Sequence, residues 1–315
     1  MINLKLNYWN SKLLILLTIN CFLKLEAQNP NVSSGKIVSY NNFQSKYVDA
    51  RNVNVWLPAE YDSTKNYPVL YMHDGQQLFD STITWNKQEW KMDETASKLI
   101  AANKITPFIV VGIWNNGIKR RFEYMPQKPF NKLPKKTQFN IRNQFMNQST
   151  NEPFDLQADR YLKFIVKELK PFIDLNFSTS TNQENTFIGG SSFGGMISWY
   201  AVCEYPSIFG NAICMSTHWP GLFPGTFNPQ LPEQFLNYLK KKLPTSNSHR
   251  IYFDYGTETL DAYYETYQLR VDAVMEQKGY KDGEWMSLKF VGEDHSEKAW
   301  AKRLDYPLVF LFGKK

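Results

Sequence analysis

Short unbroken apolar runs alternate along the chain with segments whose apolar residues recur at helical spacing. Val69–Met72 and Phe108–Trp114 are continuous runs, which is typical of strands covered on both faces. In Asp159–Leu175 the apolar side chains follow a helical period instead, which predicts an amphipathic helix. The chain therefore mixes buried strands with helices rather than keeping one period throughout.

The second half of the chain repeats strand and helix in alternation. Strands are predicted at Thr186–Gly189, Asn211–Ser216, Ile251–Tyr255 and Met286–Val291, and helices at Gly194–Glu204, Pro232–Lys242, Asp261–Lys278 and Glu297–Leu311. The first half adds β-rich pieces at Lys36–Tyr40 and Val53–Leu57 and a helix at Asp93–Asn103. Such alternation predicts the α/β class, with a mostly parallel central sheet and helices on both faces.

Two segments interrupt this alternation, near residues 116–156 and 219–249. Residues 116–142 hold eight Lys or Arg against one Glu, with frequent Pro, Asn and Gln. That composition predicts a loop insertion or a mobile lid rather than a part of the hydrophobic core. No internal repeat or clean boundary divides the rest, so residues 28–315 are interpreted as a single domain with two insertions.

Residues 1–27 have the pattern of a secretory signal peptide. Lys5 and Lys12 form a basic start, and Leu13–Leu23 is an apolar run too short to span a bilayer. A cleavage site before Gln28 is predicted, with an uncleaved anchor as the alternative. The expected location is secreted or periplasmic, with no stable membrane insertion after cleavage.

Composition excludes several classes of protein. Hydrophobic residues make up 43% of the 315 residues and aromatic residues 16%, which excludes a disordered chain. The net charge of +6 is mild and interspersed, so no nucleic-acid partner is expected. Three cysteines are too few for a disulfide scaffold. Beyond the leader, Cys203 and Cys214 are interpreted as buried thiols, although an oxidising compartment would permit a bridge.

The chemistry-bearing motif is Gly190-Ser191-Ser192-Phe193-Gly194, which matches G-x-S-x-G. It lies between a predicted strand and a predicted helix, the context that a nucleophile elbow requires. Ser192 must project from a sharp turn, and glycines two residues away on either side leave room for it. The alternatives are a glycine-rich turn without chemistry or a phosphate cradle.

A serine nucleophile needs a histidine base held by a carboxylate. His295 follows the predicted strand 286–291, as the order Ser, acid, His requires. His73, His218 and His249 fit that order less well. The acid should follow the strand 251–255, where Glu258 and Asp261 are both candidates. Asp261 is favoured, although Asp is also a preferred helix N-cap.

Acyl transfer also needs two N–H donors for the developing oxyanion. The Phe193 N–H, directly after the nucleophile, is the first. The second is expected in the loop His73-Asp74-Gly75-Gln76, after an earlier strand. The Gln76 N–H is favoured, with the Gly75 N–H as the alternative.

Four segments resemble the putative esterase family, which includes enterochelin, feruloyl and acetyl-xylan esterases. They are Tyr71–Gln76, Arg120–Pro126, Gly189–Gly195 and Asp294-His295. The resemblance implies an α/β-hydrolase fold, no cofactor, and ester hydrolysis through an acyl-serine intermediate. It matches Ser192 to the nucleophile, His295 to the base and Asp74-Gly75-Gln76 to the oxyanion loop. The chain departs from the family pattern at the acid.

The expected function is thus a secreted serine esterase with no metal or cofactor. Its substrate is expected to be a small-molecule or glycan-linked ester, carbohydrate-linked or from a siderophore. The alternative is a non-catalytic, α/β-hydrolase-like glycan-binding protein. Four tryptophans could stack on sugar or aromatic rings, although most are expected in the core: Trp85, Trp90, Trp114 and Trp219.

Overall fold

The structure is a computed structural model, and it describes residues 29–147 and 154–314. The predicted signal peptide at residues 1–27 lies outside the described residues, as does part of the first predicted insertion. Within the described ranges, no helix has both the length and the apolar character needed to cross a membrane.

The described residues form an eight-stranded sheet in the order β1-β2-β4-β3-β5-β6-β7-β8. The strands are β1 Lys36–Phe43, β2 Arg51–Leu57, β3 Val69–His73, β4 Ile109–Ile113, β5 Thr186–Ser191, β6 Asn211–Met215, β7 Arg250–Gly256 and β8 Trp285–Phe290. β1 and β2 pair antiparallel, β2 also meets β4 antiparallel, and every pair from β4 to β8 is parallel. The prediction of a mostly parallel sheet is confirmed.

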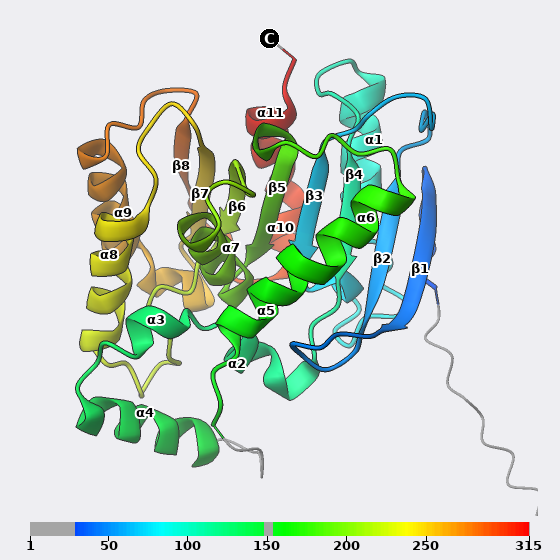
Figure 1. Cartoon of the computed structure of the whole chain (residues 1–315). Helices are drawn as coiled ribbons and strands as arrows, with labels where there is room; N and C mark the ends of the chain where they lie inside the picture. Colours follow the sequence, from blue (N-terminus) through cyan, green and yellow to red (C-terminus); the bar gives the residue numbers. More distant parts are fainter. Residues whose placement is uncertain (1–28, 148–153, 315) are drawn as a thin grey trace, which may run out of the picture.

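Helices cover both faces of the sheet, and Figure 1 shows α5 and α6 crossing one face with α10 behind the other. The helices are α1 Met92–Ala101, α2 Arg120–Tyr124, α3 Gln127–Phe130, α4 Lys135–Asn147, α5 Ala158–Phe164, α6 Lys170–Asn176, α7 Phe193–Glu204, α8 Gln230–Lys242, α9 Glu265–Gln277, α10 Glu297–Arg303 and α11 Asp305–Phe312. Each face therefore has its own helical cover and its own core.

The two cores explain why β3 and β4 are unbroken apolar runs. Along β3, Val69 and Tyr71 pack into the core beneath α5 to α9, whereas Leu70 and Met72 pack into the core beneath α1, α10 and α11. Successive side chains of a strand point to opposite faces. A strand buried on both faces needs apolar residues at every position, which removes the polar alternation of a half-exposed strand.

The interpretation of residues 116–142 as a loop or mobile lid is wrong. The segment folds into α2, α3 and most of α4, and Phe122, Tyr124 and Phe130 are buried. Its only acidic residue, Glu123, accepts two hydrogen bonds from buried Arg51 of β2, at 2.8 and 2.6 Å. The sequence did not reveal this core, because lysines and arginines separate its apolar positions along the chain.

Two predicted helices are interrupted where proline removes a backbone donor. The predicted helix 297–311 is divided into α10 and α11, since Pro307 has no N–H for the Arg303 carbonyl. The predicted helix 159–175 contains a π segment at Ile165–Leu169, just before Pro171. Both interruptions change the backbone hydrogen bonds of the helix, and the side chains that face the core stay buried.

Cys203 and Cys214 are both free and buried, as expected. Burial raises the pKa of each thiol above its usual value. A buried neutral thiol behaves as a small apolar side chain, so these cysteines belong to the core.

Candidate active site

Ser192 occupies a strained turn between β5 and α7, with φ 59° and ψ −122°. A Cβ added at Gly190 would lie 3.1 Å from both the Gly194 backbone and the His73 Cβ, so side chains would not fit there without movement. The Ser192 N–H donates to the Met215 carbonyl at 3.0 Å, and the Ser192 carbonyl accepts from the His218 N–H at 3.2 Å. These bonds hold a backbone conformation that costs about 1–3 kcal/mol on its own.

His295 lies in the loop after β8, where its imidazole meets Asp261. The distance from His295 Nδ1 to Asp261 Oδ1 is 2.6 Å. A carboxylate can only accept, so Nδ1 carries the hydrogen and Nε2 of the neutral ring keeps its lone pair. The Thr259 hydroxyl accepts from the His295 N–H at 2.9 Å and fixes the loop. The imidazole is therefore held through Nδ1, and its Nε2 is not engaged by Asp261.

The two candidate acids are placed very differently. Asp261 is buried within a 3-10 turn, Thr259–Tyr263, whereas Glu258 is exposed before that turn. The following helix α9 begins only at Glu265, so Asp261 is not its N-cap. The structure brings Asp261 to His295 and leaves Glu258 in solvent.

The loop after β3 forms a tight turn. Asp74 has the left-handed φ of 58°, and a 3-10 turn follows at Gly75–Gln77. A Cβ on Gly75 would lie 2.3 Å from the Gly112 carbonyl carbon, so this turn packs directly on β4. The Gln77 N–H closes the turn onto the Asp74 carbonyl at 2.9 Å. The Gln76 N–H has no acceptor in that turn, and the Phe193 N–H, first in α7, has none in its helix.

Asp74 is held by Arg120, the first residue of α2. Arg120 Nε and Nη2 each donate to one Asp74 oxygen at 2.7 Å, and Asn115 Nδ2 donates at 2.7 Å as well. Burial alone would raise the pKa of Asp74, but the Arg120 charge and these hydrogen bonds outweigh it and lower the pKa. The Arg120 guanidinium also lies 5.9 Å from the centre of the Phe193 ring. One arginine therefore links the loop after β3 to the start of α7.

The other histidines have local partners. His73 Nδ1 contacts the Tyr161 hydroxyl at 2.8 Å, and His218 Nδ1 contacts the Tyr264 hydroxyl at 2.6 Å. Burial lowers the pKa of each of these two imidazoles to about 3. His249 lies at the opposite edge of the sheet, against the Pro206 carbonyl.

Aromatic rings connect the serine turn with His295. The His218 ring lies 4.9 Å from Phe193 and 5.7 Å from Tyr264, whose ring is 5.8 Å from His295. Phe223 extends this wall outward, 5.5 Å from His218, with the Arg121 guanidinium 5.8 Å from its ring. Ser192, Asp261 and His295 thus lie along one carboxyl edge of the parallel strands, beside an aromatic wall.

Two of the four tryptophans considered as stacking platforms, Trp90 and Trp219, are buried and not available for stacking. Trp114 is half-buried and donates its indole N–H to Asn54. Trp85 differs, since it is 84% exposed. Among the described residues, no group of three or more His, Cys, Asp and Glu side chains is placed to bind a metal ion.

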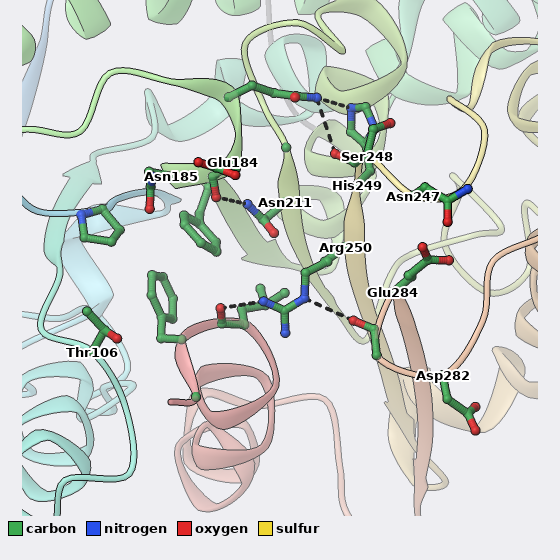
Figure 2. Close-up of a pocket in the computed structure, with 18 residues that line it drawn as sticks. Thr106, Glu184, Asn185, Asn211, Asn247, Ser248, His249, Arg250, Asp282 and Glu284 are labelled. Atoms are coloured by element: carbon green, nitrogen blue, oxygen red, sulfur yellow. Dashed lines mark hydrogen bonds between the residues drawn. The ribbon is translucent and has the colours of Figure 1, made fainter. Parts of the chain in front are cut away.

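A cavity of about 880 Å³ lies at the other edge of the sheet, where β5, β6 and β7 begin. Figure 2 shows that polar side chains around it bind neighbouring backbone. Arg250 donates to the Gly283 and Leu311 carbonyls at 3.1 and 2.9 Å, and Asn211 donates to the Glu184 carbonyl at 2.8 Å. These contacts join strand starts to the end of α11, and Ser192 lies at the opposite ends of the strands.

Comparison with known proteins finds relatives among esterases. An endo-1,4-beta-xylanase/feruloyl esterase of Xylanibacter ruminicola is 27% identical over 209 residues, which are 65% of this chain and 24% of that protein. This chain thus spans about a quarter of that relative's length.

Among solved structures, the enterobactin esterase FES of Shigella flexneri superposes with a TM-score of 0.62 at 16% identity, covering 90% of this chain and 60% of that one. A ferulic acid esterase gives a TM-score of 0.62 at 17% identity, covering 89% and 98%. At such identities the likeness shows the fold, which is that of the α/β-hydrolases. The family profile described as Putative esterase matches residues 47–308. With that match over most of its length, the chain belongs to the Putative esterase family of ester hydrolases.

Proposed function

We propose that this protein is a serine carboxylic-ester hydrolase in which Ser192 is the nucleophile, His295 the base and Asp261 the acid. The observation that carries the proposal is the 2.6 Å contact from Asp261 to His295 Nδ1, which leaves Nε2 to accept a proton. Ser192 stands on a strained turn at the same sheet edge. A hydroxyl is a weak nucleophile and needs such a base.

The reaction proceeds in two halves. Ser192 Oγ attacks the ester carbonyl while His295 Nε2 takes its proton, and the N–H groups of Phe193 and Gln76 stabilise the oxyanion. The imidazolium then protonates the leaving alcohol, which gives an acyl-serine. Water, deprotonated by His295, attacks this ester, and the imidazolium returns the proton to Ser192 Oγ as the acid is released. No cofactor is needed for either half.

The substrate class is proposed to be a carbohydrate-linked or siderophore ester. The relative from Xylanibacter ruminicola is named a feruloyl esterase, and the Shigella flexneri structure is an enterobactin esterase. Phe223 is half-buried at the outer end of the aromatic wall, above buried Phe193 and His218, and it supports a planar acyl group at the site, since aromatic side chains pack well against flat rings. The leader predicted at residues 1–27 supports a secreted or periplasmic location.

The first test replaces the nucleophile. Ser192→Ala is expected to abolish hydrolysis of nitrophenyl acetate and labelling by a fluorophosphonate, because both need the activated hydroxyl. Ser63→Ala, at an exposed serine, should leave both unchanged. Turnover by Ser192→Ala at the wild-type rate would refute the mechanism. A wild-type protein that neither hydrolyses esters nor reacts with the fluorophosphonate would instead support a glycan-binding role.

The second test separates the two carboxylates. An Asp→Asn change in a triad of this type lowers kcat by about 10⁴, because the imidazole loses its correct tautomer. Asp261→Asn is expected to show that loss, and Glu258→Gln is expected to retain activity. The reverse result would assign the acid to Glu258. A panel of acetyl, feruloyl and catecholate esters then measures acyl preference through kcat/KM.

A further inference from the structure

Asp261 rests on a buried polar network that the sequence motifs do not include. Ser216 directly follows β6, Asp254 lies within β7, and Arg303 is the last residue of α10. All three are buried, with Arg303 only 2% exposed. They come from separate elements and meet behind Asp261, on the side away from His295.

The hydrogen bonds of the Ser216 hydroxyl fix the direction of its proton. A serine hydroxyl has one hydrogen to donate and two lone pairs to accept with. Arg303 Nη2 donates to Ser216 Oγ at 2.7 Å, and Trp300 Nε1 donates to it at 3.0 Å. Both lone pairs are therefore occupied, and the one hydrogen is left for Asp261 Oδ2, at 2.5 Å.

The two oxygens of Asp261 consequently have different roles. Oδ2 accepts from the Ser216 hydroxyl and from the Gly256 N–H, at 2.6 Å, while Oδ1 contacts His295. Rotation of the carboxylate would break both bonds to Oδ2. Charge-assisted hydrogen bonds of this kind are about twice as strong as neutral ones, so they hold Oδ1 toward the imidazole.

Arg303 is fixed as well. Its Nε and Nη2 each donate to a carboxylate oxygen of Asp254 at 3.2 Å, and Nη2 lies 3.7 Å from Asp261 Oδ2. The Ser216 N–H donates to the Asp254 carbonyl at 2.8 Å and to its carboxylate at 3.1 Å. Asp254 thus holds both the arginine and the serine that face Asp261.

We propose that Ser216 is a positioning residue for ester hydrolysis, whose hydroxyl, oriented by Arg303 and Trp300, holds Asp261 in the rotamer that orients His295. This inference rests on the proposed function, because it assigns a role in the Ser192 reaction. Ser216 does not touch the reacting atoms. It acts only through Asp261.

The test is Ser216→Ala, measured with nitrophenyl acetate. Loss of a hydrogen bond to a charged group is expected to lower kcat by about 10- to 100-fold. KM should change little, since no substrate contact is removed. Ser198→Ala is the matched control, because its buried hydroxyl bonds only a helix carbonyl, that of Gly194. This control should keep wild-type kcat.

A spectroscopic measurement separates positioning from general damage. A proton held between an imidazole nitrogen and a carboxylate resonates at low field, and the His295 signal is identified by its loss in His295→Gln. Ser216→Ala should move that signal upfield, whereas Ser198→Ala should leave it in place. Unchanged kcat together with an unmoved signal in folded Ser216→Ala would overturn the proposal.

Two further variants, Ser216→Cys and Ser192→Ala, cover the remaining outcomes. If Ser216→Ala does not fold, Ser216→Cys keeps a side chain of similar shape with a weaker donor, and it should show an intermediate loss of kcat. A fully active Ser216→Cys with an unmoved low-field signal would overturn the proposal. Ser192→Ala distinguishes failure of the proposed function. If Ser192→Ala is active, the whole mechanism fails. If Ser192→Ala is inactive and Ser216→Ala is fully active, only the role of Ser216 is refuted.

Discussion

The geometry of the pair formed by Asp74 and Arg120 predicts how much stability the protein loses when the pair is broken. In Asp74→Asn an amide N–H₂ faces the guanidinium, so at least one of two 2.7 Å charged hydrogen bonds is lost. The backbone should stay, because asparagine tolerates the left-handed φ of 58° at least as well as aspartate. Breaking a buried pair costs about 3–5 kcal/mol. Because the Arg120 side chain is 24% exposed, solvent reduces the expected loss to about 3 kcal/mol.

Asp74→Asn should also lower kcat, because it disturbs the loop that follows Asp74. Loss of one oxyanion donor typically lowers kcat by about 10²–10³, which sets the upper limit for Asp74→Asn. The free energy of unfolding is measured by urea denaturation, and kcat with nitrophenyl acetate. Asp49→Asn is the control, because Asp49 pairs with Lys119 of the same chain segment but its side chain is 56% exposed. It should lose at most about 1 kcal/mol and no activity. If Asp74→Asn matched this control in stability and kcat, the structural role assigned to Arg120 would be wrong.

Two other predictions test the site and its surroundings. Gly75→Ala should lower kcat by about 10²–10³ with a smaller effect on KM. The reason is that a Cβ placed 2.3 Å from the Gly112 backbone must displace the loop after β3, which carries the proposed Gln76 donor. A fully active variant would exclude Gln76 as a donor. His73 and His218 have pKa values near 3 when folded, against about 6.5 when unfolded. The stability they contribute is complete above pH 6.5 and falls toward pH 3, by about 1.4 kcal/mol per pH unit for each. Urea denaturation at pH 7 and pH 5 should therefore show a smaller pH-dependent loss in His73→Gln than in the wild type, and equal losses would contradict the shift.

Patterns of neighbouring residues in the sequence predicted the strands and the turn at Ser192, because short-range sterics and burial determine both. Strands buried on both faces are unbroken apolar runs, and the glycines around Ser192 mark a turn that admits no side chain beside it. The core within residues 116–142 was missed, because its apolar residues are spread among lysines and arginines. Its anchor, the pair of Arg51 and Glu123, joins positions 72 residues apart.

The support of the site could not be read from the sequence for a similar reason. Ser216, Asp254 and Arg303 form no spaced motif, and their contacts depend on three chain segments meeting behind β6 and β7. A serine after a strand and an arginine ending a helix are common by themselves. Only the register of the parallel strands, with Met215 opposite Asp254, makes them partners of Asp261.

The contrast between Asp74 and Asp261 explains why Asp261, and not Asp74, is the carboxylate proposed as the acid. Each lies near an arginine. Arg120 donates to both oxygens of Asp74 at 2.7 Å, so each oxygen already has a charged partner, and the imidazole of His73, its neighbour in sequence, bonds the Tyr161 hydroxyl instead. Arg303 instead lies 3.7 Å from Asp261 and reaches it through the Ser216 hydroxyl, which occupies one oxygen and leaves the other to His295. In the proposed mechanism, the distance from the arginine thus separates the aspartate that stabilises a loop from the aspartate that orients the base.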